Sequence, residues 1–552
     1  MLTADPDADL EQALVDWRKY RRRRRVADIH FIDALYKVYM TALLGAATLY
    51  GLAAVDGDEK LSAEAMHDVA VHGADWLGVF TAVVVAIGLR SGARGGPLAL
   101  ERAEVRHVLL APVDRTVALR GPAIHQLRFL LFAASLAGVE AGLLASARLE
   151  HHAGKWMVAG AAYAVATVLL GYGVALCASA WRVPSPLATA VGVVLIAWAV
   201  ADGVGVVAHS PAAAWGNLGV APDTLVWTGA LAIVASLAVA AVGLTRVGDM
   251  SLEAAERRSS LVGQIRFAAT LQDVRTVIVL RRQLAMELPR LKPYVRLRTR
   301  GVSRFPVWGR GLRGVLRWPA ARVGRLLLLG AVAGLALRGA WEGTTALIVV
   351  GGLALYIAAL DAVEALAEEV DRPTRSRTLP MEPGELHVRH LPVAVAVMVL
   401  AGAVAAVAAV AAGPSLQAAA VAAACVIPGA LGGVAGAVTS VLSGAPDDAA
   451  WSLAPPEVAG VRLVMRTAWP IVLSIGGTLP VLAARSAAEA GRDPTGGAVS
   501  AALAVAVAFV VVALWVRKRD DLRTAWAEAT DPAAQRRRRE SLANEEALSD
   551  AR

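Results

Sequence analysis

The sequence predicts an all-α polytopic membrane protein of about 12 transmembrane helices, arranged in two six-helix halves with both termini cytoplasmic. Apolar residues make up 57% of the 552-residue chain and charged residues only 18%, which is more apolar surface than a soluble protein can solvate. The apolar residues also gather in runs suited to crossing a bilayer. These runs lie at about 31–55, 76–89, 127–147, 156–180, 186–208, 225–245, 323–341, 344–362, 391–412, 416–440, 467–488 and 498–516.

The positions of the basic residues set the expected orientation. The segment after the first run begins Asp56-Gly57-Asp58-Glu59 and is acidic, whereas six arginines lie between Arg90 and Arg120 after the second run. Cytoplasmic loops carry an excess of Lys and Arg. The N-terminus and the second loop are therefore expected in the cytoplasm, with the chain in the cell inner (plasma) membrane. The net charge of +9 then reflects topology and lipid contact, and no nucleic acid is expected as a partner.

Composition divides the chain into five regions. The lead-in repeats Leu10, Leu14 and Trp17 at helical spacing before five arginines, which predicts an amphipathic helix at the membrane surface. The stretch between the halves is strongly basic and ends in interleaved Trp and Arg, a pattern typical of the membrane interface. The expected regions are a cytoplasmic amphipathic lead-in (1–30), a first six-span half (31–246), a basic cytoplasmic helical linker (247–322), a second six-span half (323–516) and a charged cytoplasmic tail (517–552).

A charged segment follows the second run of each half. Both copies hold an acid, an Arg, then Leu and Pro followed by another acid. A membrane protein that repeats a cytoplasmic element in each half is expected to meet a partner with each copy, although the positive-inside rule alone also demands basic residues there. The residues singled out are Glu104, Arg106, Pro112, Asp114 and Arg115 in the first copy, and Glu369, Arg372, Pro380 and Glu382 in the second.

The sequence shows no catalytic, nucleotide or metal constellation. Gly154-Lys155 lacks the rest of a phosphate-binding loop, and the glycines at 309–314 follow no predicted strand. The pair His387 and His390 has no carboxylate or cysteine placed with it as a ligand set. The chain is therefore expected to be no enzyme and to bind no cofactor or metal of its own.

Two acids lie within apolar runs, Glu140 in the third and Asp202 in the fifth. A charge in hydrocarbon is costly unless it is paired or wet, so both residues are candidates for a substrate path or for proton transfer. Structural pairing, or a place near the outer interface, explains them equally well. Glycines spaced four apart at 429/433 and 432/436 predict close helix packing in the tenth run.

The segment from Glu104 to Pro122 resembles the loop after the second span in permease subunits of ABC-2-type exporters. That loop often holds an acid, two leucines, a small residue and Pro before a polar, basic turn, as in Leu109-Leu110-Ala111-Pro112 here. The second copy departs from it, with Thr378 where a second Leu would stand before Leu379-Pro380. The central segment from Leu271 to Leu284 is similar to actinobacterial permease-type membrane proteins.

The resemblance implies a mechanism. Each half would supply one six-span permease unit, and two separately encoded ABC ATPase subunits, carrying ATP and Mg²⁺, would dock on the charged segments to drive export. The lead-in would serve as the elbow helix of such permeases. The substrate is not implied.

Two other classes remain open. One is an ion-coupled 12-span secondary transporter, which would bind substrate near the midplane and could use Glu140 or Asp202. The other is a non-transport membrane scaffold. Copurification of an ATPase, or ion-dependent uptake without ATP, separates these classes.

Overall fold

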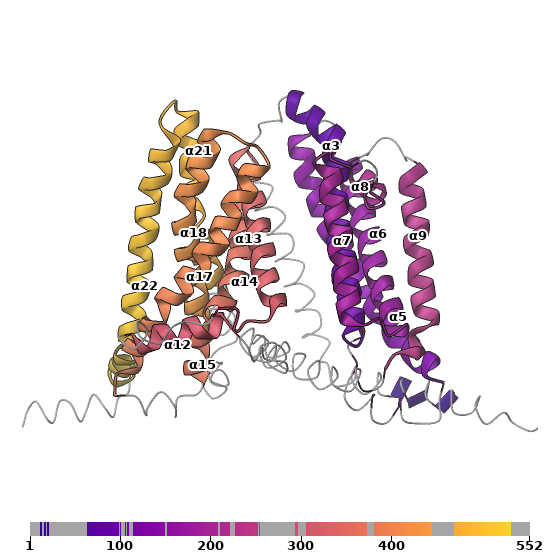
Figure 1. Ribbon diagram of the computed structural model, residues 1–552, viewed down its shortest axis with the longest axis horizontal. Helices are drawn as coiled ribbons and strands as arrows, with labels where there is room; N and C mark the ends of the chain where they lie inside the picture. The colour runs from indigo at the N-terminus through magenta and orange to yellow at the C-terminus, as the bar shows by residue number, and fades with distance from the viewer. Residues whose placement is uncertain are drawn as a thin grey trace, which may run out of the picture. The chain divides into compact units, whose positions relative to one another are not determined.

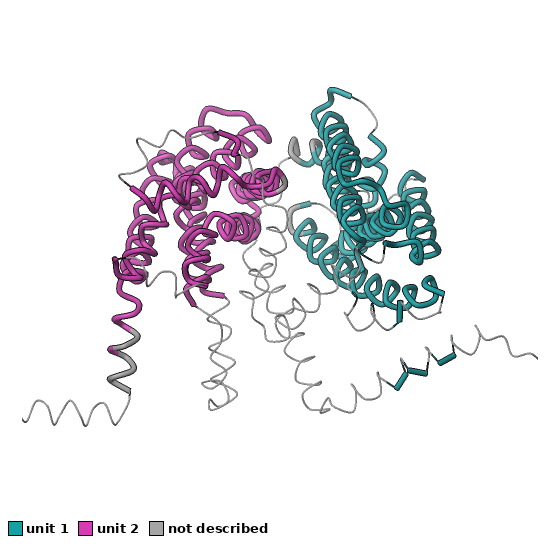
Figure 2. Tube along the Cα trace, turned by 60° about the horizontal axis from the view of Figure 1, so that its bottom comes forward, with its two compact units in different colours: residues 1–272 teal, residues 273–552 magenta. Residues whose placement is uncertain are grey.

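The computed structural model describes residues 63–253 and 293–530, together with six helical residues between 12 and 20. The predicted first run, most of the linker and most of the tail lie outside the described residues. The chain divides into two compact units, residues 1–272 and 273–552 (Figure 2), and each is described by itself. Within 63–253 and 293–530, the residues left out are 99, 101–104, 106–107, 110–113, 150–151, 208–209, 221–226, 252, 296–304, 372–379 and 444–467.

Unit 1 is built around α6, which packs against α3, α5 and α9 (Figure 1). Two-thirds of the apolar stretch of α6 is buried, against about a sixth of that of α5, so α6 is the central helix. Small residues allow its close approach to α3, because a Cβ on Gly88 would lie 2.3 Å from the carbonyl oxygen of Gly171. The elements are α3 (Ala63–Ala93), α5 (Arg115–Arg148), α6 (Ala153–Ala180), α7 (Ser185–Gly203), α8 (Ala213–Val220), α9 (Trp227–Thr245) and the 3₁₀ turn η1 (Val247–Asp249).

Unit 2 is built around α18, which packs against α14, α17 and α22. The predicted glycine pairs lie at its contacts. Gly432 and Gly436 approach the backbone of Gly477 and Pro470, while Gly433 lies over Leu355 of α14. The elements are α12 (Pro306–Val315), α13 (Ala320–Trp341), α14 (Leu347–Ala362), α15 (Glu364–Asp371), α17 (Pro383–Ala411), α18 (Leu416–Leu442), a helix at Ala468–Gly476, α21 (Leu479–Glu489) and α22 (Pro494–Thr530).

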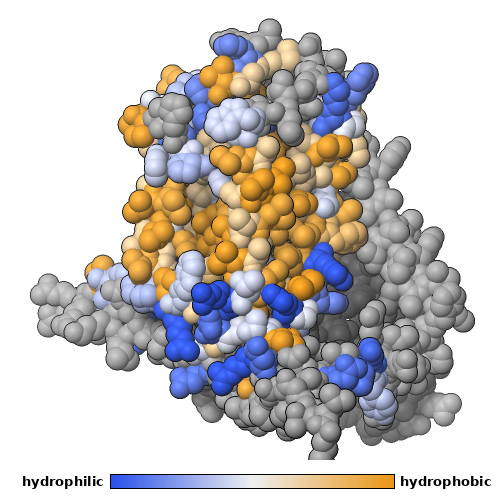
Figure 3. Space-filling model, turned by 90° about the vertical axis from the view of Figure 1, so that its right-hand side faces the viewer, coloured by the Kyte–Doolittle hydropathy of each residue, from blue (hydrophilic) through white to orange (hydrophobic). Residues whose placement is uncertain are grey.

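In the described part of the chain, nine helices are long and apolar enough to cross a membrane, or up to eleven if each of two bent helix pairs forms one span. Those residues contain helices and turns but no strand. The prediction of a polytopic all-α membrane protein is confirmed at this level. Eleven of the twelve predicted runs coincide with these helices, and the run at 31–55 lies outside the described residues. Figure 3 shows the corresponding apolar band across unit 1, with hydrophilic side chains above and below it.

Several predicted boundaries differ from the structure; α3, for example, begins at Ala63 rather than at 76. The third run, predicted at 127, belongs to a helix that begins at Arg115, because a helix can continue beyond the apolar stretch that marks its membrane part. The run at 344–362 ends in a bend of 59° into α15. The run at 467–488 is bent by 42° between Gly476 and Leu479, where Gly477 and Pro480 interrupt regular helix.

Part of the helix packing is common to both units. The pair α5 and α6 in unit 1 corresponds to α17 and α18 in unit 2. The central helix of each pair also packs against the preceding span (α3 or α14) and against the last span (α9 or α22). The two units therefore place the start of α5 and the start of α17 in equivalent positions.

Candidate functional site

Most described arginines lie at one end of each unit. In unit 1, α3 and α9 finish at this end and α5 and α7 begin there; in unit 2, α13 and α17 begin there and α12 runs across it (Figure 1). We call this the basic end of each unit. Its arginines include Arg90, Arg94, Arg115, Arg120, Arg182 and Arg246 in unit 1, and Arg310, Arg313, Arg317, Arg322, Arg325, Arg389 and Arg517 in unit 2.

The first charged segment leads directly into α5 at the basic end of unit 1. Asp114 is the N-cap of this helix, and its Oδ1 accepts a hydrogen bond from the backbone N–H of Thr116 at 2.7 Å. Arg115 is the first helical residue, and both side chains are exposed. Thr116 lies against the turn that ends the last span, since a Cβ on Gly248 would be 2.4 Å from its Oγ1. The other predicted residues of this segment, Glu104, Arg106 and Pro112, lie outside the described residues.

The second charged segment also ends with an acid at an N-cap position, although the Glu382 side chain makes no capping hydrogen bond. Pro380 and Glu382 are exposed, and Glu382 occupies the N-cap position of α17 with extended backbone angles. Two residues later, a Cβ on Gly384 would lie 2.1 Å from the carbonyl oxygen of Arg517 in α22. Each unit thus presents a Pro-x-acid sequence at the start of a long helix, and the first turn of that helix touches the end of the last span. Arg372 lies outside the described residues.

A buried ionic network connects the start of α13 to the bend between α14 and α15. Arg325 pairs with both carboxylate oxygens of Asp361, its Nε lying 2.9 Å from Oδ2. Arg322 pairs with Glu364 and donates to the backbone carbonyl of Asp361 at 2.8 Å. The network therefore balances two positive and two negative charges, and it fixes the bend to α13.

Trp318 completes the packing around this network. The guanidinium of Arg322 lies 4.2 Å from the centre of the Trp318 ring, which is the arrangement of a cation–π interaction. The Arg322 side chain is only 9% exposed. Its position between an indole face and a carboxylate leaves it little freedom, so the start of α13 is held rigidly.

Glu369 is buried, whereas Asp114, Arg115, Pro380 and Glu382 are exposed. It is 1% exposed, and its carboxylate lies 2.7 Å from Arg310 of α12. His387 and His390 of α17 are buried at the same end, and neither ring nitrogen of His390 has a hydrogen-bond partner among the described residues. Glu369 was predicted to contact a partner. Its burial means that it can act on one only by positioning α15 against α12.

The two intramembrane acids lie apart from this end. Asp202 is in the last turn of α7, is 8% exposed, and its Oδ2 accepts from the backbone N–H of Ser210 at 2.8 Å. This bond closes the turn after the helix, which is the structural pairing considered from the sequence. Glu140 is half-buried on α5, about 38 Å along the helix from Arg115 at 1.5 Å per residue. That depth places it near the end opposite the basic end.

The sequence indicated where the acids of the ionic network lie but not which arginines pair with them. Asp361 and Glu364 follow the eighth run visibly, but Arg322 and Arg325 lie 36 or more residues before them. One signal was available in the sequence: Arg322 and Arg325 are three residues apart, as are Asp361 and Glu364. Among the described residues, no group of three or more His, Cys, Asp or Glu side chains could hold a metal ion.

Comparisons with family models, curated proteins and solved structures give no match to this chain. The assignment of a function therefore depends on the geometry above. That geometry contains two exposed acids at N-cap positions, each at the start of a helix that crosses its unit, and one buried ionic network. Such elements can transmit a displacement from a bound partner to the helices of the unit.

Proposed function

We propose that the chain is the membrane-spanning permease subunit of an ATP-driven exporter of the ABC-2 type, working with a separately encoded ATPase. In this proposal it spans the plasma membrane twelve times, with its basic ends and both termini in the cytoplasm. The distribution of arginines supports the orientation, because basic residues remain on the cytoplasmic side. ATP and Mg²⁺ would be bound by two ATPase subunits, because the chain repeats the charged segment once in each unit.

The observation that carries the proposal is an exposed acid repeated at the N-cap position of a long helix, Asp114 before α5 and Glu382 before α17. Each is exposed and charged, as a docking contact that fixes register on a partner must be. Each also lies at the N-terminus of a long helix, which we treat as a rigid rod. The 34 residues of α5 and 29 of α17 correspond to about 51 Å and 44 Å of helix at 1.5 Å per residue.

These lengths matter because the hydrocarbon core of a bilayer is about 30 Å thick. Each rod therefore extends beyond the core and carries a displacement at its start into the membrane. The contacts of Thr116 with Gly248 and of Gly384 with Arg517 join that displacement to the last span of the unit. Movement of a rigid element about packed neighbours is a known form of switching transition.

The ionic network supports a second route in unit 2. The segment before Pro380 begins at α15, which Arg310 holds through Glu369. The adjoining bend is held to α13 by the pairs made by Arg322 and Arg325. A displacement of α15 would thus reach α12 and α13 through these ion pairs.

The test is purification of the full chain from its native host in mild detergent, with bound proteins identified and ATPase activity assayed. We expect a stoichiometric ATPase with a phosphate-binding loop, released by Asp114→Arg combined with Glu382→Arg. The matched control is Asp493→Arg. Asp493 is also an exposed capping acid, accepting from Thr495 and Gly496, but it lies at the opposite end of unit 2.

An intact, monodisperse chain that binds no ATPase, under conditions that preserve other complexes, would refute the proposal. So would equal loss of the ATPase from the Asp493→Arg control. The ion-coupled transporter would then be tested through Glu140, since Asp202 is already engaged by the backbone of Ser210.

A further inference from the structure

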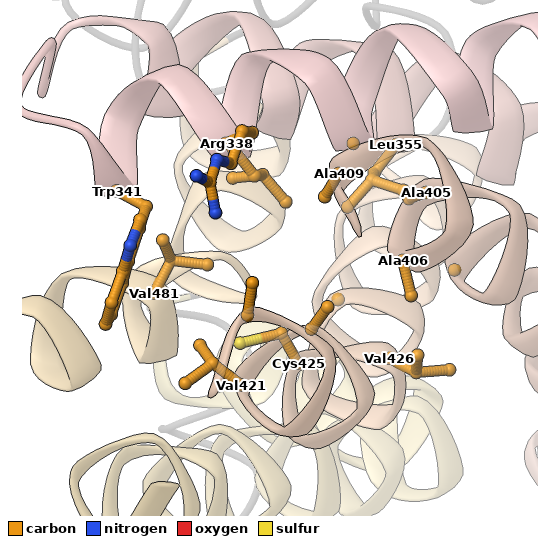
Figure 4. A pocket seen from close by; sticks show the side chains of 16 residues that line it. Arg338, Trp341, Leu355, Ala405, Ala406, Ala409, Val421, Cys425, Val426 and Val481 are labelled. Carbon is orange, nitrogen blue, oxygen red and sulfur yellow. The ribbon is translucent and has the colours of Figure 1, made fainter. Parts of the chain in front are cut away.

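Unit 2 contains an apolar cavity between α13, α17 and α18, with Leu355 of α14 and Val481 of α21 at its sides (Figure 4). It holds about 590 Å³ of space not filled by protein atoms, its open mouth included. The cavity exists because the facing surfaces of α17 and α18 carry small residues. Those of α17 are Gly402, Ala405, Ala406 and Ala409, and those of α18 include Ala418, Ala422 and Gly429.

The chemistry of the lining selects an apolar occupant. Nearly all of the lining side chains are alanine, valine, leucine or glycine, so they offer no hydrogen bonds to water. A water molecule in a cavity needs two to four polar partners to be stable. An empty void, in turn, leaves its lining without dispersion contacts. Since the surrounding helices are membrane spans, the apolar material that can enter is a lipid tail.

Arg338 gives the cavity one charged end. It is the single charged residue in the lining, and its guanidinium points into the space in Figure 4. It lies four residues from the C-cap of α13, near the level at which a lipid headgroup sits. Its Nε donates to Glu342 at 2.6 Å, while Nη2 lies over Gly413, where a Cβ would be 2.4 Å away.

The surroundings of Arg338 favour an anionic group as its second partner. The Arg338 side chain is 19% exposed whereas its Glu342 partner is 50% exposed, so the carboxylate is largely solvated and neutralises the arginine incompletely. A guanidinium has five N–H donors in a planar fork, and one is used by Glu342. The remaining donors match the oxygens of a phosphate.

We propose that this cavity binds one acyl chain of an anionic membrane phospholipid, with its phosphate on Arg338. The tail lies among the small residues of α17 and α18, and Trp341 covers the same end as Arg338. The site is independent of the proposed transport function: it would be occupied whether or not an ATPase binds. It is a resident lipid site that fills the core of unit 2 and holds α13 to α17 and α18.

The test uses the purified full chain with phosphatidylglycerol carrying a photoreactive diazirine in one tail. After illumination and proteolysis, we expect the label on peptides of α17 and α18. Ala422→Phe fills the cavity and should reduce this labelling roughly tenfold, since overpacking a filled site costs about 1–3 kcal/mol. The matched control is Ala423→Phe, the same change one residue along the same helix, where the side chain is exposed.

The headgroup is tested with Arg338→Gln. Wild type should prefer the phosphatidylglycerol probe over the phosphatidylcholine probe by about fivefold, as expected for one partly exposed ion pair, and the variant should lose this preference. Each variant is first checked for monodisperse elution. If Ala422→Phe fails that check, Ala409→Leu replaces it on the opposite wall.

Three outcomes would overturn the proposal. Labelling of α17 and α18 that Ala422→Phe and Ala423→Phe reduce equally would place the probe on the outer surface. If Arg338→Gln leaves the preference for phosphatidylglycerol unchanged, Arg338 does not hold the lipid headgroup. Labelling by a diazirine fatty acid but not by the phospholipid probe would assign the cavity to a free amphiphile.

Discussion

Replacing Asp361 with asparagine tests the buried ionic network directly. The change keeps the size of the side chain but removes its charge. Arg325 then loses its bidentate partner, while Arg322 keeps Glu364. Removing one partner of a buried pair commonly costs about 3–5 kcal/mol, because the other charge stays buried. Asp361 is 11% exposed but Arg325 is 33% exposed, so the freed guanidinium can partly regain water. We therefore expect a loss of about 3 kcal/mol, at the low end of that range.

The assay is equilibrium unfolding of the full chain in mixed micelles, followed by circular dichroism. Glu342→Gln is the control, because it breaks an exposed arginine pair of the kind that contributes about 0–1 kcal/mol. The double variant Asp361→Asn with Arg325→Gln removes both charges of the pair. We expect it to recover part of the lost stability, since no buried guanidinium is then left without a counter-charge.

Two results would refute this reasoning. One is an Asp361→Asn variant that unfolds with the same free energy as the Glu342→Gln control. The other is strict additivity in the double variant, which would mean that the two side chains do not interact.

Three further predictions concern other contacts. Gly384→Val should destabilise unit 2 by about 1–3 kcal/mol in the same unfolding assay, because a Cβ there meets the backbone of Arg517. The control is Gly324→Val, which should cost less than about 1 kcal/mol because there is open space around Gly324. Asp114→Ala should cost about 1 kcal/mol and speed hydrogen exchange in the first turn of α5, whereas Asp114→Asn should not; equal exchange in both would contradict the capping role. Asp202→Ala should cost about 1–3 kcal/mol through Ser210, and Asp202→Asn should stay near wild type, a difference that thermal unfolding measures.

The sequence predicts the membrane helices well because their signal is local. Each apolar run marks a possible membrane span from its own residues alone, and eleven of the predicted runs coincide with helices. The start of α5 was placed twelve residues late, since Arg115 and Arg120 read as loop although the helix already includes them. Hydropathy marks only where lipid surrounds a helix. It carries no information on where the backbone hydrogen bonds begin.

The candidate site was predictable in part for the same reason. Asp114 and Glu382 stand out because an acid beside Pro precedes an apolar run, and both are N-caps in the structure. The burial of Glu369 was not predictable. It depends on Arg310, which lies 59 residues earlier and approaches only after α12 and α15 have packed. Pairings of this kind depend on the tertiary arrangement, and a single sequence does not record them.

The order of synthesis gives the ionic network a second consequence. Arg322 and Arg325 leave the ribosome before Asp361, which follows Arg325 by 36 residues. At about 5–20 residues per second, the two arginines wait several seconds without their counter-charges. During that interval they cannot enter hydrocarbon, so they anchor the start of α13 at the bilayer surface. The same side chains thus first set the depth of a nascent helix and later, once Asp361 and Glu364 have been made, belong to an ionic network with no net charge.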